Sequence, residues 1–110
     1  MVQELTADTF RQEVIDSAVP VLVDFYSPDC MPCQRIAPVI DELAAEAGGR
    51  FRVGKVNAWE EQGLAVRYRI SAVPTLVVFK GGAVVNTLVG YQDKRRLLEA
   101  LKAALDGHAA

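Results

Sequence analysis

The sequence predicts one α/β domain in which helices cover both faces of a central mixed β-sheet, an arrangement of three layers. Three observations favour this class. Strand-like and helix-like segments alternate along the chain, the strand-like segments are apolar runs typical of buried strands, and the last two are joined by a two-glycine turn. Alternating strands and helices place helices on both sides of a sheet. We expect the domain to span residues 1–110, since this length fits one compact domain.

The first half of the chain alternates strand, helix, strand and helix. Residues 2–5 form a marginal first strand, and a short helix follows with Thr6 or Asp8 as its N-cap, both residue types favoured there. The β-branched and aromatic run at residues 21–26 predicts a buried strand. Apolar residues recur at helical spacing over residues 32–47, and a pair of glycines ends this helix.

The second half predicts a strand, a short helix and then a hairpin. Residues 51–56 alternate in polarity as a strand does, and residues 60–68 form a short helix. Strands at residues 75–79 and 83–89 are joined by a tight turn at residues 80–82 that contains two glycines. These two strands therefore pair antiparallel, which makes the sheet mixed.

A last helix follows Asp93, whose carboxylate suits the N-cap position. The leucines of this helix are predicted to face inward: Leu97, Leu98, Leu101 and Leu105. Hydrophobic residues make up 51% of the chain, which is enough for a core that needs no disulfide or metal to hold it.

Composition and charge exclude several classes of function. The net charge of −2 and a pI near 5.3 argue against a nucleic-acid partner, which needs a basic face. No apolar run reaches the ~18 residues that would span a membrane, and the first residues lack the pattern of a signal peptide. We therefore expect a cytoplasmic protein, in a reducing compartment that does not favour a permanent structural disulfide.

Two cysteines form the motif Cys30-Met31-Pro32-Cys33 where a strand meets a helix. A structural zinc site normally needs four ligands, and the one histidine of the chain, His108, lies near the C-terminus. A zinc site shared between chains and an inert structural pair are the alternatives. In a cytoplasmic α/β domain this spacing favours redox chemistry.

The position of each cysteine relative to the helix predicts its role. The thiolate is the nucleophile, and the unpaired N–H groups and positive dipole end of a helix N-terminus stabilise it. Cys30 lies just before the helix, so we expect it to attack a substrate disulfide. Cys33 lies one turn into the helix, where it is more buried and resolves the mixed disulfide. Pro32 removes an N–H in the first turn that would be unpaired anyway.

Two charged residues interrupt apolar strands. Asp24 lies six residues before Cys30, and burial there would raise the pKa of its carboxyl. We favour a proton acceptor and donor for Cys33 over an idle aspartate at a strand end. Lys55 either extends its ammonium group to solvent or pairs with Asp24 beneath the cysteines, and the sequence pattern favours the first.

Several motifs, taken in order and spacing, resemble the thioredoxin family. The resemblance covers nearly the whole chain and implies the thioredoxin fold, a three-layer α/β/α domain with a central mixed sheet. The segments that carry it are Val23-Asp24-Phe25-Tyr26-Ser27, Cys30-Met31-Pro32-Cys33, Ile36-Ala37-Pro38, Lys55-Val56-Asn57, Val73-Pro74-Thr75, Phe79-Lys80-Gly81-Gly82 and Val89-Gly90.

The resemblance also implies roles for residues. Cys30 matches the nucleophile of the family, Cys33 its resolving thiol and Asp24 its buried proton carrier. Lys55 matches the lysine beside that aspartate, which favours their pairing. Pro74 matches a cis-proline beside the disulfide.

The same resemblance implies a substrate-binding surface. The backbone of Val73 would pair with an extended substrate segment, and Gly90 would flank this surface where a side chain would block close approach. Trp59 would lie beside Tyr26 and close to the cysteines.

The sequence departs from the usual pattern of the family at this contact surface. Asp29 and Met31 stand where the family usually has tryptophan and glycine around the first cysteine. Tyr26 and Trp59 replace a tryptophan and an aspartate that tend to interact in the family. These departures leave the fold intact and bear on reduction potential, substrate range and choice of reductase.

From these observations we expect a monomeric protein-disulfide reductase that serves electron transport and cell redox homeostasis. Its Cys30–Cys33 disulfide is redox-active, it binds no cofactor or metal, and a flavin-dependent, NADPH-using thioredoxin reductase re-reduces it. The first alternative is a reductant dedicated to one or a few partner proteins. A non-catalytic binding module and a disulfide-forming oxidant are further alternatives, disfavoured by the intact cysteines beside Asp24 and by the missing signal peptide.

Overall fold

The fold is described from a computed structural model, which places residues 2–107. Strands and helices alternate in the predicted order. In chain order the elements are β1 (Gln3–Glu4), α1 (Ala7–Phe10), the π-helical turn η1 (Arg11–Ile15), β2 (Val21–Tyr26), α2 (Met31–Glu46), β3 (Arg52–Asn57), α3 (Gln62–Arg67), β4 (Thr75–Lys80), β5 (Ala83–Val89) and α4 (Lys94–Leu105).

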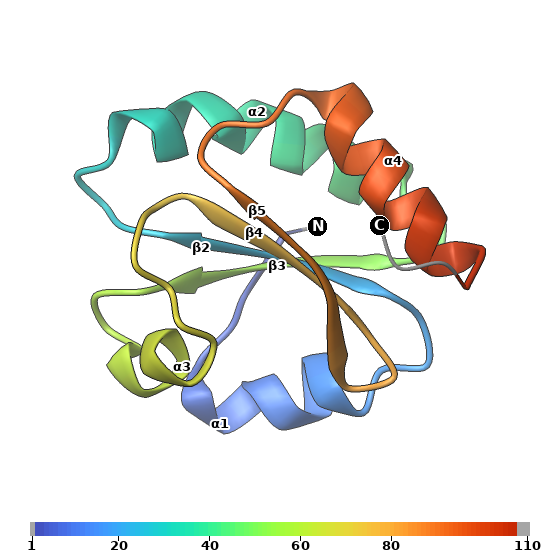
Figure 1. The fold of residues 1–110 in the computed structure, drawn as a ribbon, viewed down its shortest axis with the longest axis horizontal. Helices are drawn as coiled ribbons and strands as arrows, with labels where there is room; N and C mark the ends of the chain where they lie inside the picture. Colours follow the sequence, from blue (N-terminus) through green and yellow to red (C-terminus); the bar gives the residue numbers. More distant parts are fainter. Residues whose placement is uncertain (1, 108–110) are drawn as a thin grey trace.

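The strands form one five-stranded sheet in the order β1-β3-β2-β4-β5 (Figure 1). β3 pairs parallel with both β1 and β2. The β2–β3 pair is parallel because α2 carries the chain back across the sheet between them. β4 pairs antiparallel with β2 and with β5. The sheet is therefore mixed, as the hairpin predicted.

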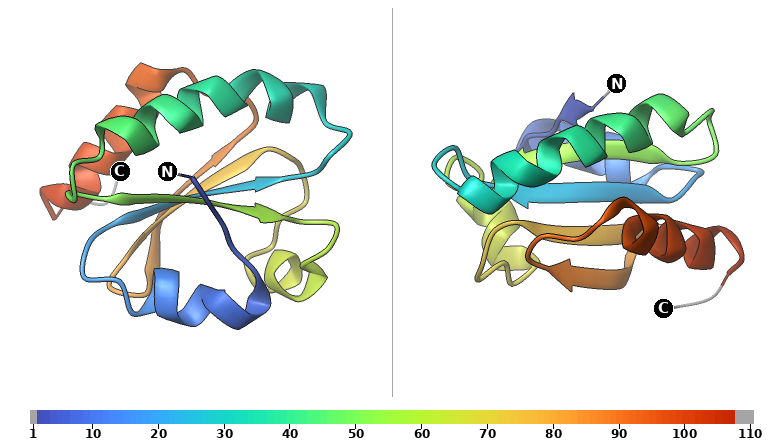
Figure 2. Two further views of the ribbon diagram at one scale, coloured as in Figure 1. Left: turned by 180° about the vertical axis from the view of Figure 1, so that it is seen from behind. Right: turned by 90° about the horizontal axis from the view of Figure 1, so that it is seen from above.

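Helices cover both faces of the sheet. Helices α2 and α4 lie on one face and α1 and α3 on the other, as Figures 1 and 2 show. The side chains of β2 alternate between two apolar cores, with Leu22 packed in the core under α2 and α4 and Val23 and Phe25 in the core over α1. Because Asp24 and Leu22 share a face, Asp24 lies on the side of the sheet that α2 covers.

The first helix has an ending that the sequence did not reveal. Of the two predicted N-caps of α1, the structure has Thr6, while Asp8 lies in the first turn; the Thr6 backbone N–H donates to Thr9 Oγ1 at 3.0 Å. The chain then widens into a π-helical turn, in which the Asp16 N–H donates to the Arg11 carbonyl at 2.9 Å. Phe10 and Val14 are buried all the same, so the apolar spacing alone did not distinguish the two kinds of helix.

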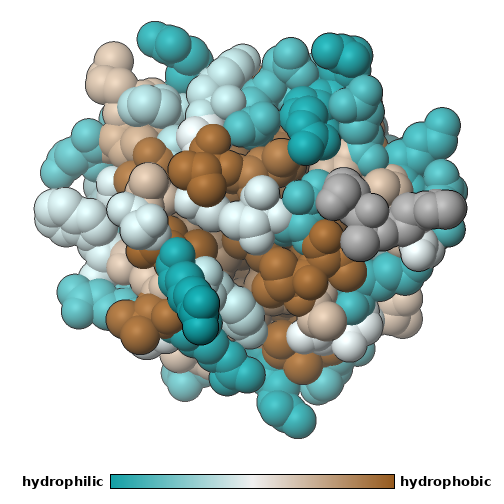
Figure 3. Space-filling model, viewed as in Figure 1, coloured by the Kyte–Doolittle hydropathy of each residue, from teal (hydrophilic) through white to brown (hydrophobic). Residues whose placement is uncertain are grey.

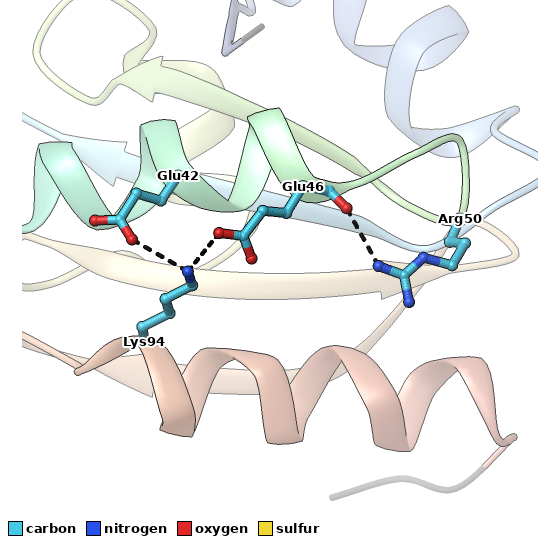
Figure 4. A network of polar contacts seen from close by, with 4 residues as sticks. All are labelled: Glu42, Glu46, Arg50 and Lys94. Carbon is cyan, nitrogen blue, oxygen red and sulfur yellow. Dashed lines mark hydrogen bonds and ion pairs between the residues drawn. The ribbon is translucent and has the colours of Figure 1, made fainter.

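Helices α2 and α4 are joined by ion pairs at the surface (Figure 4). Lys94 Nζ lies 3.1 Å from Glu42 Oε1 and 2.5 Å from Glu46 Oε2. These hydrogen bonds, that to Glu46 first, raise the pKa of Lys94. Arg50 donates to the Glu46 carbonyl at 3.2 Å, which holds the loop after α2 against the last carbonyls of the helix.

The predicted inward face of helix α4 is only partly right. Asp93 caps the helix as expected, and its Oδ1 accepts from the Arg96 N–H at 2.9 Å. Leu97 and Leu101 are buried, but Leu98 and Leu105 are exposed. The buried stripe is completed by Ala100 and Ala104, because small side chains let the helix approach the sheet closely.

The β4–β5 hairpin forms one edge of the sheet. Gly81 and Gly82 have φ values of 60° and 82°, the left-handed pair that a type I′ turn requires. Exposed apolar residues such as Val84 and Val89 lie along β5, and Figure 3 shows apolar patches among hydrophilic side chains on this side of the molecule. Within residues 2–107, no helix is long and apolar enough to cross a bilayer.

Candidate active site

The site forms where the end of β2, the start of α2 and the start of β4 meet. β2 and β4 run antiparallel, and the register that pairs Phe25 with Thr75 brings the loop before β4 to the carboxyl end of β2. The first residues of β4 pair in turn with the last residues of β5, since Thr75 is opposite Val89. This topology therefore places Cys30, Pro74 and Gly90 at one end of the sheet.

Cys30 and Cys33 form a disulfide with their Cα atoms 5.1 Å apart. Both residues are buried, Cys33 slightly more, with exposed fractions of 8% for Cys30 and 5% for Cys33. Cys30 is the N-cap of α2, and its sulfur accepts from the Cys33 N–H at 3.1 Å. The helix start thus directs a backbone donor at the sulfur that the sequence predicted to be the nucleophile. Pro32 lies in the first turn, as expected.

The loop before β4 faces the same sulfur. The Val73–Pro74 peptide bond is cis, as the resemblance implied, and the Val73 carbonyl oxygen lies 3.6 Å from Cys30 Sγ. Gly90 N donates to the Pro74 carbonyl at 2.8 Å and has a φ of 89°, which favours glycine. A Cβ added at Gly90 would meet no described atom within 4 Å, so the surface in front of it is open.

Asp24 is buried beneath the cysteines. Its side chain lines a cavity of about 190 Å³ together with Cys33 and Lys55. Asp24 Oδ1 has no hydrogen-bond partner among the described residues. Burial raises the pKa of Asp24 to about 7, with Lys55 opposing this rise and Glu4 adding to it. The predicted direction is confirmed, and the carboxyl can exchange a proton near neutral pH.

Lys55 neither extends fully into solvent nor pairs with Asp24, the two positions that the sequence allowed. It is opposite Asp24 in the β2–β3 register, but the ion pair it makes is with Glu4, whose Oε1 lies 3.9 Å from Lys55 Nζ. The ammonium group also lies 5.5 Å from the centre of the Tyr26 ring. Lys55 therefore acts on Asp24 through its charge, from a half-exposed position at the edge of the cavity.

Glu4 is the site residue that sequence reasoning missed. The Tyr26 hydroxyl donates to its carboxylate, with 2.9 Å to each oxygen. Burial and this hydrogen bond raise the pKa of Tyr26 to about 12, so the hydroxyl stays a donor over the working pH range. Glu4 lies in a two-residue edge strand, and only the parallel register of that strand with β3 would have placed it beside Lys55.

Met31 and Trp59 are exposed on the surface around the site. Their exposed fractions are 69% and 66%, high for such large apolar side chains. Trp59 and Val73 line one shallow cavity of about 250 Å³, which connects the indole to the loop that faces Cys30. Tyr26, which the resemblance placed beside Trp59, directs its hydroxyl to Glu4. Asp29 is exposed as well.

Metal ligands are not gathered anywhere in the described part of the chain. Among residues 2–107, no group of three or more His, Cys, Asp or Glu side chains could hold a metal ion. His108, the remaining candidate from the sequence, lies outside the described residues.

A buried disulfide at a helix N-terminus, beside a cis-proline loop and above a buried aspartate, defines a thiol–disulfide oxidoreductase. The chain matches the Thioredoxin family over residues 1–103. It is 47% identical over 102 residues to Thioredoxin 1 of Nostoc sp., covering 93% of this chain and 95% of that relative. It is 45% identical over 97 residues to Thioredoxin 1 of Synechococcus elongatus, covering 88% and 91%.

A third relative is the chloroplastic M-type thioredoxin of Spinacia oleracea, 40% identical over 104 residues, which cover 94% of this chain and 58% of that protein. The chain belongs to the thioredoxin family. It is a dithiol–disulfide reductase with a redox-active Cys30–Cys33 pair, and thioredoxins bind no cofactor. Membership implies thioredoxin reductase and disulfide-containing proteins as the classes of partner.

Proposed function

We propose that Cys30 attacks and Cys33 resolves in the reduction of protein disulfides. The Cys30 thiolate attacks one sulfur of a substrate disulfide, and the other substrate sulfur leaves as a thiolate. The Cys33 thiolate then attacks Cys30 Sγ, which releases the second substrate thiol and forms the Cys30–Cys33 disulfide. Two electrons pass to the substrate. The observation that carries this assignment is the Cys33 N–H directed at Cys30 Sγ at the start of α2.

Asp24 is the proton carrier of this reaction. Resolution requires Cys33 to lose its proton, and Asp24 shares a cavity with Cys33. A carboxyl with a pKa of about 7 can accept that proton near neutral pH and return it in the reverse direction. The charge of Lys55, at the edge of the cavity, opposes part of the rise in the pKa of Asp24 and so keeps that pKa near neutral. Pro74 and Pro32 shape the loop and the helix start on either side of the disulfide.

The substrate binds across Val73, Gly90, Met31 and Trp59. The Val73 backbone pairs with an extended substrate segment; the position of its carbonyl, 3.6 Å from Cys30 Sγ, supports this role. The open surface at Gly90 admits that backbone, while Met31 and Trp59 offer exposed apolar side chains. Exposed large apolar side chains next to a reactive group are typical of a protein-binding surface.

The partners follow from the chemistry of the family. A flavin-dependent, NADPH-using thioredoxin reductase re-reduces the disulfide, and the substrates are disulfide-containing proteins. We propose that the protein works as a monomer in the cytoplasm, with residues 1–110 forming one domain. No nucleic acid or membrane takes part in the reaction.

A specific observation favours a second candidate, a reductant dedicated to one or a few partners. Asp29, Met31 and Trp59, where the sequence departs from the usual pattern of the family, are all exposed around the disulfide. Residues at this surface contact substrates and reductase directly, so they can narrow the range of partners.

Reduction of insulin by dithiothreitol tests the proposed activity and its breadth. The wild-type protein should accelerate insulin precipitation, and the Cys30→Ser variant should lose this acceleration. A control Thr87→Ala variant, which alters an exposed residue of β5, should retain it. A wild-type protein that reduces a natural partner but not insulin would favour the dedicated reductant, and one inactive on both would contradict the proposal.

A further inference from the structure

Three charged side chains form one row across the sheet, from its edge to its buried centre. Glu4 of β1 is opposite Lys55 of β3, and Lys55 is opposite Asp24 of β2. Residues opposite one another in a sheet direct their side chains to the same face. The row therefore alternates in charge and runs from the half-exposed Glu4 to the buried Asp24.

Tyr26 anchors the outer end of this row. It lies two residues after Asp24 in β2, so it shares the same face of the sheet. Its hydroxyl donates to both carboxylate oxygens of Glu4 at 2.9 Å, and its ring lies 5.5 Å from Lys55 Nζ. Glu4 thus has two partners, Lys55 on β3 and Tyr26 on β2, and the hydrogen bond from Tyr26 holds its carboxylate on the Lys55 side.

The row ends in the cavity that Asp24 shares with Cys33. Tyr26 and Lys55 line the same cavity. The groups that face Asp24 are Glu4 from β1, Tyr26 from β2, Lys55 from β3 and Cys33 from α2, while β4 contributes the apolar Leu76 opposite Asp24. Lys55 is therefore the positive group of this set, and its position decides how strongly it acts on Asp24.

We propose that Glu4 is a positioning residue for disulfide exchange: anchored by the Tyr26 hydroxyl, it holds the Lys55 ammonium at the edge of the cavity rather than against Asp24. In the structure the ion pair of Lys55 is with Glu4, at 3.9 Å, and not with Asp24. The inference rests on the proposed role of Asp24 as proton carrier. A direct Lys55–Asp24 ion pair would keep the carboxylate ionised and unable to return a proton.

Glu4 raises the pKa of Asp24 in two ways. Its negative charge disfavours ionisation of Asp24, and its hold on Lys55 keeps the positive charge at a distance. Removing the charge of Glu4 takes away the repulsion and frees Lys55 to approach Asp24. Both changes make the Asp24 carboxyl more acidic.

Titration of the Asp24 side-chain carboxyl by ¹³C NMR in the oxidised protein tests the inference. Glu4→Gln should lower the titration midpoint by about half a pH unit to one unit at low salt, less at high salt. Tyr26→Phe keeps the ring but removes the anchor, so it should lower the midpoint by a smaller amount. Glu4 is half-exposed, so its variant should fold as the wild type does.

Glu13→Gln is the matched control. Glu13 Oε1 lies 3.8 Å from Arg52 Nη1, so the control removes another carboxylate that pairs with a cation on β3. It should leave the Asp24 midpoint unchanged. In a Lys55→Gln background, Glu4→Gln should lower the midpoint by less than in the wild-type background.

An unchanged or raised Asp24 midpoint in Glu4→Gln, or an unchanged midpoint in Tyr26→Phe, would overturn the inference. So would a shift in the Glu13→Gln control as large as that in Glu4→Gln. A Glu4→Gln shift that is as large in the Lys55→Gln background as in the wild-type background would also overturn it. The pH profile of insulin reduction separates this failure from that of the underlying role. It should move to lower pH with the NMR midpoint. A midpoint that moves while the rate profile stays would instead overturn the role of Asp24, and the inference with it.

Discussion

The Cys30 sulfur lies between one group that favours its negative charge and one that opposes it. The Cys33 N–H at the start of α2 donates to the sulfur, which stabilises a thiolate there. Asp29 directly precedes Cys30 and is exposed, so its carboxylate repels that thiolate through solvent. The balance of these two effects sets how readily Cys30 attacks and how strongly the protein reduces.

Asp29→Asn should make Cys30 more reactive and the protein a weaker reductant. Two unit charges about 6 Å apart repel by roughly 0.7 kcal/mol at the dielectric of water, which is about a threefold change in thiolate population. Alkylation of the reduced protein at pH 7 and low salt should therefore be about threefold faster in the variant, and its reduction potential less negative. The difference should shrink as salt is added. Alkylation that is unchanged or slower at low salt would contradict the repulsion.

Asp24 destabilises the fold at and above neutral pH. Its pKa is about 7 in the folded protein, against 3.8 for an aspartate in water, so the folded state binds the proton more tightly than the unfolded chain does. Stability is therefore lost as pH rises from about 4 to about 7, and the whole cost is present above pH 7. A shift of this size corresponds to roughly 4 kcal/mol, which is an upper bound for a buried group with a nearby cation.

Asp24→Ala should stabilise the protein at pH 8 while slowing disulfide exchange. We expect a gain of about 1–3 kcal/mol, because the alanine leaves a small cavity and a less well-compensated Lys55. Below pH 4 the gain should vanish, since Asp24 is then protonated in both states. Urea unfolding at the two pH values measures the difference. A variant that is clearly less stable than the wild type at pH 8 would contradict the desolvation argument.

At the scale of elements, the strand β2 and the helix α2 place the chemistry, and both were predictable. The apolar run at residues 21–26 admits only one charged residue, and the helix after it starts at the cysteine motif. β1 was far less predictable, because two residues carry no periodicity. Gly54 of β3, opposite Gln3, lets β1 approach the sheet closely. A Cβ on Gly54 would lie 2.6 Å from the Leu5 side chain and 3.2 Å from the Gln3 carbonyl.

Helix α4 depends on its N-cap, since Asp93 is followed by Lys94, Arg95 and Arg96 in the first turn. Positive charges there oppose the helix dipole, so the Asp93 carboxylate contributes both a hydrogen bond and charge compensation. Asp93→Ala should cost about 1 kcal/mol and lower Tm by about 4 °C in thermal unfolding. Asp41→Ala, an exposed aspartate within α2, is the control and should change Tm little. Equal losses in both variants would contradict the role of the cap.

At the scale of the whole molecule, two apolar cores lie on the two faces of the sheet, and one row of charged residues, Glu4, Lys55 and Asp24, runs across it. The alternation of elements predicted the layers, and the apolar spacing predicted most of both cores. Tertiary packing decided the rest: α4 approaches the sheet through Ala100 and Ala104, which leaves Leu98 and Leu105 at the surface. The contacts of Glu4 with Tyr26 and Lys55 join residues 22 and 51 positions apart, beyond what spacing along one element can reveal.

Covalent trapping tests the assignment of the two cysteines most directly. Cys33→Ser and Cys30→Ser variants are each reduced, incubated with a disulfide-containing protein such as insulin, alkylated and separated on a non-reducing gel. Without its resolving thiol, Cys33→Ser should accumulate a mixed disulfide through Cys30 that dithiothreitol releases, and Cys30→Ser should accumulate none. Trapping by Cys30→Ser but not by Cys33→Ser would reverse the two roles and contradict the account.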